Sequence, residues 1–238
     1  MSLVGSAAVV IWNDVTLDSR ADFLEWHNRE HIPERVSIPG FRRARRGCGM
    51  VTGPEFLTLY EVADAAVLTS GHYLDRLNSP SAWTQRIMPE FRNTARSLCR
   101  VEVSVGGGVG GYLCSVRLHD ELRQDQKTLV RFHAFTCDLV RKSRGMLGAH
   151  LLTLDTRASR QEIAENRLRA EPVEMPATIL LVEGTAPDVS AVARELADEL
   201  ERLALISRSD AVTGVYRHEL CLVTSDRDAL AILGFGAL

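Results

Sequence analysis

Hydrophobic and polar positions along the first part of the chain predict strands separated by helices. Runs of alternating or β-branched apolar residues are typical of strands, and apolar residues spaced three and four apart are typical of helices. Strands are predicted over 7–15, 41–50, 56–62 and 96–105, and helices from Ser19 to Pro33, over 64–78 and beyond Ser79-Pro80. This order is βαββαβ, the order of a ferredoxin-like module.

The rest of the chain repeats the same order. Strands are predicted over 112–119, 146–156, 177–184 and 211–224, and helices over 122–143, 159–170 and 188–205. When Gly145 is placed over Gly40, the copies are offset by about 105 residues and Thr136 stands where the first copy has His31. We therefore predict two repeats, 1–106 and 112–238, joined by the glycine-rich segment 107–111. Because the second copy lacks the histidine-proline signature, two equivalent sites are not expected.

The glycines at the joint contain the pattern G-x-G-x-x-G over 106–111. A dinucleotide-binding turn needs this pattern between a strand and a helix. Tyr112 to His119 instead predict another strand, so we interpret the glycines as a flexible connection.

A single βαββαβ sheet carries helices on one face and leaves the other face bare. Two such sheets bury their bare faces by closing into a barrel with the helices outside. The predicted fold class is therefore α+β: tandem ferredoxin-like repeats that pair their antiparallel sheets into one α/β barrel. We expect the barrel to enclose a largely apolar chamber that can hold a small molecule.

Titratable residues are unusually dense at the end of the first predicted helix, from Trp26 to Pro33. His27, Glu30 and His31 match H-x-x-E-H, a zinc-peptidase pattern in which both histidines share a helix face. The match is short, and Pro33 is predicted to interrupt the helix two residues later, because proline lacks a backbone donor. We therefore predict no metal site.

The residues W-x3-E-H-x-P at 26–33, followed by Pro39-Gly40-Phe41, resemble the EthD-type branch of the dimeric α/β-barrel superfamily. The resemblance implies a small-molecule enzyme, since relatives include cofactor-free oxygenases of aromatic compounds, isomerases of small lactones and haem-handling enzymes. It places His31 as a catalytic base or hydrogen-bonding group facing the barrel cavity. A histidine that caps the helix C-terminus is the alternative.

Further candidates for substrate binding are Trp26 or Trp12 as an aromatic wall, His150 in a predicted buried strand, and an arginine such as Arg43. His150 is alternatively a core histidine with satisfied hydrogen bonds. The arginine-rich strand 41–50 is predicted to be a solvated edge strand, with an anion contact as the alternative. No cofactor is predicted; haem, held by His31 or His133, is retained as a further alternative.

Composition adds limits to these hypotheses. The chain has 238 residues, with 28 basic and 31 acidic side chains, so we expect no nucleic-acid partner. We expect no membrane span, and the five scattered cysteines indicate a cytoplasmic protein with reduced thiols. The expected partner is a small hydrophobic or aromatic molecule, and self-association stays open. Whether the protein catalyses a reaction or only binds a ligand also stays open.

Overall fold

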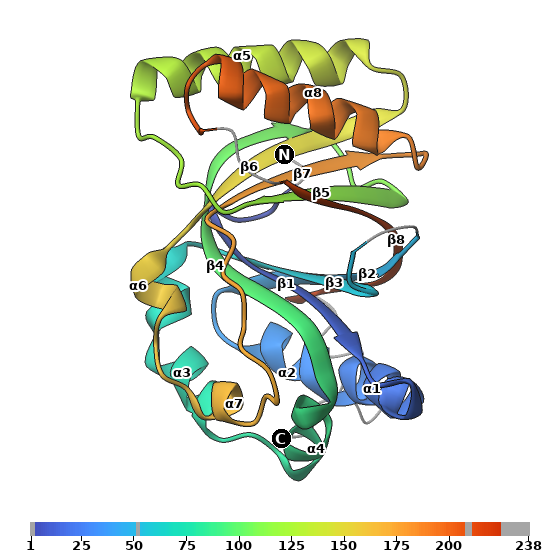
Figure 1. Ribbon diagram of the computed structural model, residues 1–238. Coiled ribbons are helices and arrows are strands. Elements are labelled where there is room, and N and C mark those ends of the chain that lie inside the picture. Colours follow the sequence, from blue (N-terminus) through green and yellow to red (C-terminus); the bar gives the residue numbers. More distant parts are fainter. Residues whose placement is uncertain (1–2, 51–52, 208–210, 225–238) are drawn as a thin grey trace.

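The computed structural model describes residues 3–50, 53–207 and 211–224, and these form a closed barrel of strands with helices outside (Figure 1). The strands are β1 Ala7–Val15, β2 Phe41–Gly49, β3 Phe56–Val62, β4 Phe91–Gly106, β5 Tyr112–Leu118, β6 Met146–Leu154, β7 Thr178–Gly184 and β8 Val212–Val223. The helices are α1 Arg20–Trp26, α2 Ile32–Ser37, α3 Gly71–Asn78, α4 Ala82–Ile87, α5 Gln126–Lys142, α6 Thr156–Ser159, α7 Ala164–Arg167 and α8 Val189–Arg202. Single 3-10 turns span Leu17–Ser19, Ala65–Thr69 and Met88–Glu90.

The barrel consists of two four-stranded sheets with the same internal order. The strand order around the barrel is β1-β3-β2-β8-β5-β7-β6-β4, and antiparallel pairs β2–β8 and β4–β6 join the two sheets. Helices α1 to α4 cover the first sheet, and α5 and α8 cover the second (Figure 1). The predicted fold class is confirmed. Each helix in the described part of the chain is too short or too polar to reach across a bilayer.

Side chains fill the centre of the barrel. Trp12 and Leu59 from the first sheet meet Leu181 and Tyr216 from the second in one buried cluster. The Trp12 indole Nε1 donates a hydrogen bond of 2.9 Å to Ser115 Oγ across the barrel. The prediction of an apolar chamber at this place is wrong, because large inward-facing side chains from both sheets already occupy it.

A buried ion network lies in the same interior. Arg45 contacts Glu61 Oε1 at 2.9 Å and Glu183 Oε2 at 2.9 Å, and Arg43 Nη2 lies 2.7 Å from Glu61 Oε2. His150 Nε2 lies 3.4 Å from Glu183 Oε1, and its Nδ1 is 2.9 Å from Ser104 Oγ. Burial by itself raises the pKa of Glu183, but the contacts with His150 and Arg45 outweigh it and lower the pKa to about 2.

The network overturns the prediction of an edge strand at 41–50. Strand β2 is hydrogen-bonded on both sides, to β3 and to β8, because a closed barrel has no edge. Arg43 and Arg45 point inward to glutamates of the chain itself, whereas Arg42 remains exposed.

The helix with the histidines continues past Pro33, contrary to the predicted interruption. A π-helical turn over His27–His31 connects α1 to α2, and the Ile32 N–H bonds to the His27 carbonyl five residues earlier. Pro33 then occupies the first turn of α2, where a missing N–H is tolerated. The wider turn therefore lets the chain stay helical while it presents His27 and His31 to the sheet.

The connection between β6 and β7 belongs to the second half of the chain but lies against the first. Its helix α7 packs beside α3, below the barrel in the view of Figure 1. A single helix over 159–170 is predicted here, and the structure instead has two short helices with an extended segment between them.

Candidate functional site

A largely enclosed cavity lies between the first sheet and the helices that cover it. Its floor is the outward face of β1 and β3, including Val9, Thr58 and Tyr60, and its roof includes Trp26 and His31. The cavity has a volume of about 30 Å³, the share of one water molecule in the liquid. The enclosed space next to His31 is therefore outside the barrel, on the helix side of the sheet.

His31 is buried at this cavity, with 7% of its surface exposed. Burial lowers its pKa well below 6.5, and the nearby charge of Arg35 lowers the pKa further, so the imidazole is neutral at pH 7. Its Nδ1 is buried, and no hydrogen-bond partner for it exists among the described residues. The Trp26 ring covers one face of the imidazole, with 4.2 Å between the ring centroids.

His27 stands one turn earlier and has a different environment. Its Nδ1 lies 3.2 Å from Arg46 Nη1, and since a guanidinium can only donate, this nitrogen accepts. Burial lowers the pKa of His27 well below 6.5, and the charge of Arg46 adds to that. His27 is therefore a neutral, hydrogen-bonded residue that packs between Phe23 and His31.

The two histidines do not form a convergent metal site with Glu30. Their rings are stacked 5.7 Å apart, and the Glu30 carboxylate accepts hydrogen bonds from Ser81 and Thr84 instead. Zinc ligands would converge on one point at about 2 Å. Across residues 3–50, 53–207 and 211–224, no group of three or more metal-ligating side chains is placed to hold an ion.

Tyr60 adds a second unsatisfied polar group to the cavity. Its hydroxyl oxygen is buried, and none of the described residues makes a hydrogen bond with it. Burial raises the pKa of Tyr60 far above 10, so the hydroxyl keeps its proton and can donate a hydrogen bond.

Three guanidinium groups, of Arg35, Arg96 and Arg169, also line the cavity. Arg35 is paired with Glu34 and Glu165. Arg96 donates to the Tyr73 hydroxyl at 2.8 Å, and Arg169 lies over the Phe91 ring at 5.0 Å. Arg96 and Arg169 form no ion pair with a carboxylate of the described residues, so the cavity wall carries excess positive charge.

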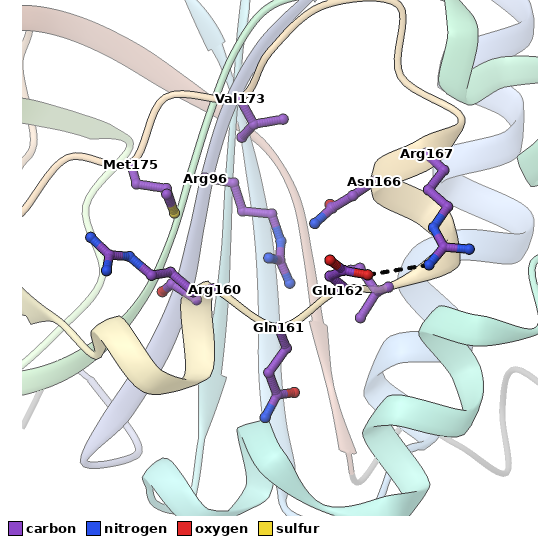
Figure 2. A pocket seen from close by; sticks show the side chains of 10 residues that line it. Arg96, Arg160, Gln161, Glu162, Asn166, Arg167, Val173 and Met175 are labelled. Carbon is purple, nitrogen blue, oxygen red and sulfur yellow. Dashed lines mark hydrogen bonds and ion pairs between the residues drawn. The ribbon is translucent and has the colours of Figure 1, made fainter.

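Arg96 also stands at the inner end of an open cleft on the surface. The cleft has a volume of about 670 Å³ and is lined mainly by the β6–β7 connection, including Ile163, Val173 and Met175. In Figure 2 the Arg96 side chain reaches into the middle of the residues that line this cleft. Arg96 therefore lines both the enclosed cavity and the open cleft.

The sequence-predicted site residues fall into two separate places. His31 and Trp26 lie at the cavity, whereas Trp12, Arg43 and His150 lie inside the barrel on the other face of the sheet. Arg96 was missed, although it shares a strand face with Leu98, where an arginine is unusual. The β6–β7 connection showed no pattern that could have identified Arg169.

The cavity as it stands does not fit a haem. The Trp26 ring covers one face of His31 and leaves an enclosed space of about 30 Å³, whereas pockets for drug-sized ligands measure about 300–1,000 Å³. Arg43 and Arg45, the arginines expected to hold the propionates, are engaged by Glu61 and Glu183. His133 is exposed on α5, where it lines an open pocket apart from the cavity at His31.

The second half of the chain does not repeat the histidine of the first. Helices α5 and α8 pack directly on their sheet through apolar side chains such as Leu129, Phe132 and Leu196. Thr136, the counterpart of His31, is buried there and its hydroxyl donates to the Phe132 carbonyl. An open pocket of about 350 Å³ beside α5 is lined by residues that include Leu129 and His133.

Comparison with known proteins supports the architecture. No family model and no curated protein matches this sequence. Among solved structures, an anthrone oxidase-like protein aligns over 95% of this chain and 97% of its own, with 8% identity and a TM-score of 0.61. A proposed monooxygenase from Fusobacterium nucleatum aligns over 93% and 96%, with 8% identity and a TM-score of 0.54. The chain has the ferredoxin-like dimeric α/β-barrel fold.

A heme-binding protein from Thermus thermophilus also aligns, over 97% of this chain and 96% of its own, with 12% identity and a TM-score of 0.45. Likeness at these levels of identity concerns the fold. The activity has to be argued from the chemistry of the site.

Proposed function

We propose that this protein is a small-molecule enzyme of the EthD type that acts on a hydrophobic or aromatic compound without a bound cofactor. The reacting group of the substrate enters the small cavity between α2 and the first sheet, and the body of the substrate occupies the open cleft of about 670 Å³ that Arg96 also lines. The observation that carries the proposal is a buried, neutral His31 with an unpartnered Nδ1 at an enclosed cavity. A buried polar atom without a partner is unfavourable in a purely structural role.

The residues around the cavity suit proton abstraction. A neutral imidazole can accept a proton from a weakly acidic C–H or O–H group of the substrate. The protonated hydroxyl of Tyr60 can donate a hydrogen bond to the oxyanion that forms, and Trp26 offers a flat apolar surface. Loss of a C–H proton leaves a carbanion that is shared with the oxyanion. If O₂ is the co-reactant, the CH₂ group becomes a carbonyl while O₂ is reduced and one water is released; without O₂, return of the proton to another carbon isomerises the substrate.

Trp12, Arg43 and His150 have a different part in this proposal. Trp12 and His150 join the two halves through Ser115 and Ser104, and Arg43 pairs with Glu61 inside the barrel. The substrate contacts predicted for these three residues are assigned to cavity residues instead. We also propose that the chain is divided into two tandem repeats, 1–106 and 112–238.

The proposal is tested with anthrone and O₂, because an anthrone oxidase-like protein shares the fold. Oxygen consumption is measured for the wild type, for His31→Asn and for the control His133→Asn on the exposed face of α5. Loss of a general base lowers turnover by about 10²–10⁴-fold, so His31→Asn should lose that much and His133→Asn nothing. Because the pKa of His31 lies well below 6.5, wild-type turnover should stay constant from about pH 8 to 6.

Turnover that is unchanged in His31→Asn would contradict the role of His31. Binding of anthrone without turnover would favour the alternative of a non-catalytic binding protein with the same fold.

A further inference from the structure

Two guanidinium groups without carboxylate partners share one buried wall. Arg96 comes from β4 of the first half, and Arg169 comes from the β6–β7 connection of the second half. Arg96 has 8% of its surface exposed and uses Nη2 on the Tyr73 hydroxyl, at 2.8 Å. The Nε and Nη1 atoms of Arg169 are buried, and neither has a hydrogen-bond partner among the described residues.

The two side chains repel each other in this arrangement. Burial and then the charge of Arg96 lower the pKa of Arg169 to about 10. Glu165, the carboxylate at the cavity, is already engaged by Arg35. Buried charges in proteins are paired as a rule. None of the described residues supplies a carboxylate that pairs with Arg96 or Arg169, so a negatively charged ligand would complete this wall.

We propose that the substrate of this site carries a carboxylate, which binds between Arg96 and Arg169 while its aromatic or hydrophobic body lies in the cleft beyond Arg96. This inference rests on the proposed function and names its substrate class. The carboxylate accepts a hydrogen bond from one of the unpartnered donors of Arg169, Nε or Nη1, and neutralises the repulsion between the guanidinium groups. Guanidinium forks bind planar carboxylates through paired hydrogen bonds, which fixes the orientation of the body.

The surroundings of the two arginines fit the rest of such a molecule. Phe41, Leu77, Met88 and Phe91 line the cavity with apolar surface, and Ile163, Val173 and Met175 do so in the cleft. A carboxylate is flat and smaller than a phosphate, and it suits an enclosed space of about 30 Å³ better. The apolar walls and the paired arginines thus indicate an amphiphilic acid rather than a fully polar metabolite.

Space for the body comes from the cleft. Its volume of about 670 Å³ lies in the range of small-molecule pockets, and Arg96, whose side chain points into it (Figure 2), also lines the cavity. An entering acid therefore meets Arg96 first and displaces its side chain from Tyr73 to reach His31.

The test compares four probes of the same ring system: 2-naphthoate, 2-naphthamide, 2-methylnaphthalene and 2-naphthyl phosphate. Binding to the full chain is measured by titration calorimetry and by quenching of tryptophan fluorescence, since Trp26 lines the cavity. Naphthoate should bind at least about tenfold more tightly than naphthamide, because hydrogen bonds to charged groups are the stronger ones.

Arg96→Gln and Arg169→Gln should each weaken naphthoate binding by about tenfold or more and leave naphthamide binding unchanged. Arg131→Gln, on the exposed face of α5 and among the lining residues of neither the cavity nor the cleft, is the matched control and should change neither. Arg96→Lys and Arg169→Lys keep the charge and should fall between wild type and the glutamine variants. They also keep the test decisive if one glutamine variant fails to fold.

Two results would contradict the inference that the substrate carries a carboxylate: equal binding of naphthoate and naphthamide, or unchanged naphthoate binding in both glutamine variants. Neither result would contradict the proposed function. Tighter binding of naphthyl phosphate than naphthoate would also overturn the inference of a carboxylate, in favour of a phosphate ester. If none of the four probes binds, the cavity is not a ligand site and the proposed function falls together with this inference.

Discussion

At the scale of single residues, the protein keeps two histidines neutral by burying them beside arginines. His31 and His27 lie in one π-helical turn, and burial followed by the charges of Arg35 and Arg46 lowers both pKa values. The π-helical turn positions both rings against the sheet, and such turns occur frequently at functional sites. A neutral imidazole can accept a proton, whereas a protonated one cannot. This arrangement therefore favours a role for these histidines as proton acceptors at pH 7 over a role as positive charges.

These low pKa values predict a loss of stability in mild acid. The folded protein binds fewer protons at His27 and His31 than the unfolded chain, whose histidines titrate near 6.5. Their contribution to the free energy of unfolding is therefore complete above about pH 6.5 and falls as the pH drops, by up to about 1.4 kcal/mol per pH unit for each histidine. Urea unfolding at pH 8, 7, 6 and 5 measures this slope.

Between pH 6.5 and 5, His31→Gln should remove the contribution of one histidine to the slope of the free energy of unfolding against pH. His133→Gln is the control, because His133 is exposed on α5 and should leave the slope as it is. A slope that His31→Gln does not change would contradict the lowered pKa of His31, because it would mean that His31 takes up protons equally in the folded and unfolded states.

At the scale of elements, a glycine forms the turn that leads from a helix into the next strand in each half of the chain. Gly40 precedes β2 with φ of 94°, and Gly145 precedes β6 with φ of 79°. Their equivalence was predicted from the repeat offset of the sequence, and both adopt the left-handed region that glycine favours. The turn at Gly40 sets where Phe41 and the following arginines enter the barrel.

Gly40→Ala should destabilise the protein by about 2 kcal/mol or more, because the backbone strain adds to a steric conflict. A Cβ atom at Gly40 would lie 2.4 Å from Val67 Cγ2. Gly71→Ala is the matched control, since Gly71 is exposed at the start of α3 with open space around its Cβ position. Thermal unfolding of both variants measures the difference, and an equal melting temperature for the two would contradict the strain argument.

At the scale of the whole molecule, a buried ion network joins the two halves across the barrel. Arg45 of β2 contacts Glu183 of β7 at 2.9 Å, and both side chains have 1% or less of their surface exposed. Because charges are expensive to bury, the pair is stabilising only while it is complete. The halves of the barrel therefore depend on each other for more than their apolar contacts.

Arg45→Met should lower the free energy of unfolding by about 3–5 kcal/mol, because it leaves two buried carboxylates with one arginine. Arg45→Met/Glu183→Gln should lose less than the sum of the two single changes, since the groups are coupled. The control is Arg141→Met, which removes an exposed pair with Asp138 and should cost at most about 1 kcal/mol. Urea unfolding compares the four variants, and additive effects would argue against coupling.

Several parts of the candidate site could be read from the sequence and others could not. The density of aromatic and titratable residues from Trp26 to His31 identified the helix that carries the site, because that signal is local. The face of the sheet that it meets was predicted wrongly. His31 lies on the helix side of the first sheet, since the barrel interior is taken up by Trp12, Tyr216 and the ion network.

The sequence by itself determined the order of strands and helices, the α+β barrel class and the turns at Gly40 and Gly145. Those features depend on periodicity and backbone preference, which act over a few residues. Only the tertiary structure decided which side of the sheet holds the cavity, that β2 is an inner strand, and that Arg169 reaches a site more than a hundred residues earlier in the chain. These features depend on the packing and the electrostatic interactions of side chains that are far apart in the sequence, so no short stretch of the sequence can predict them.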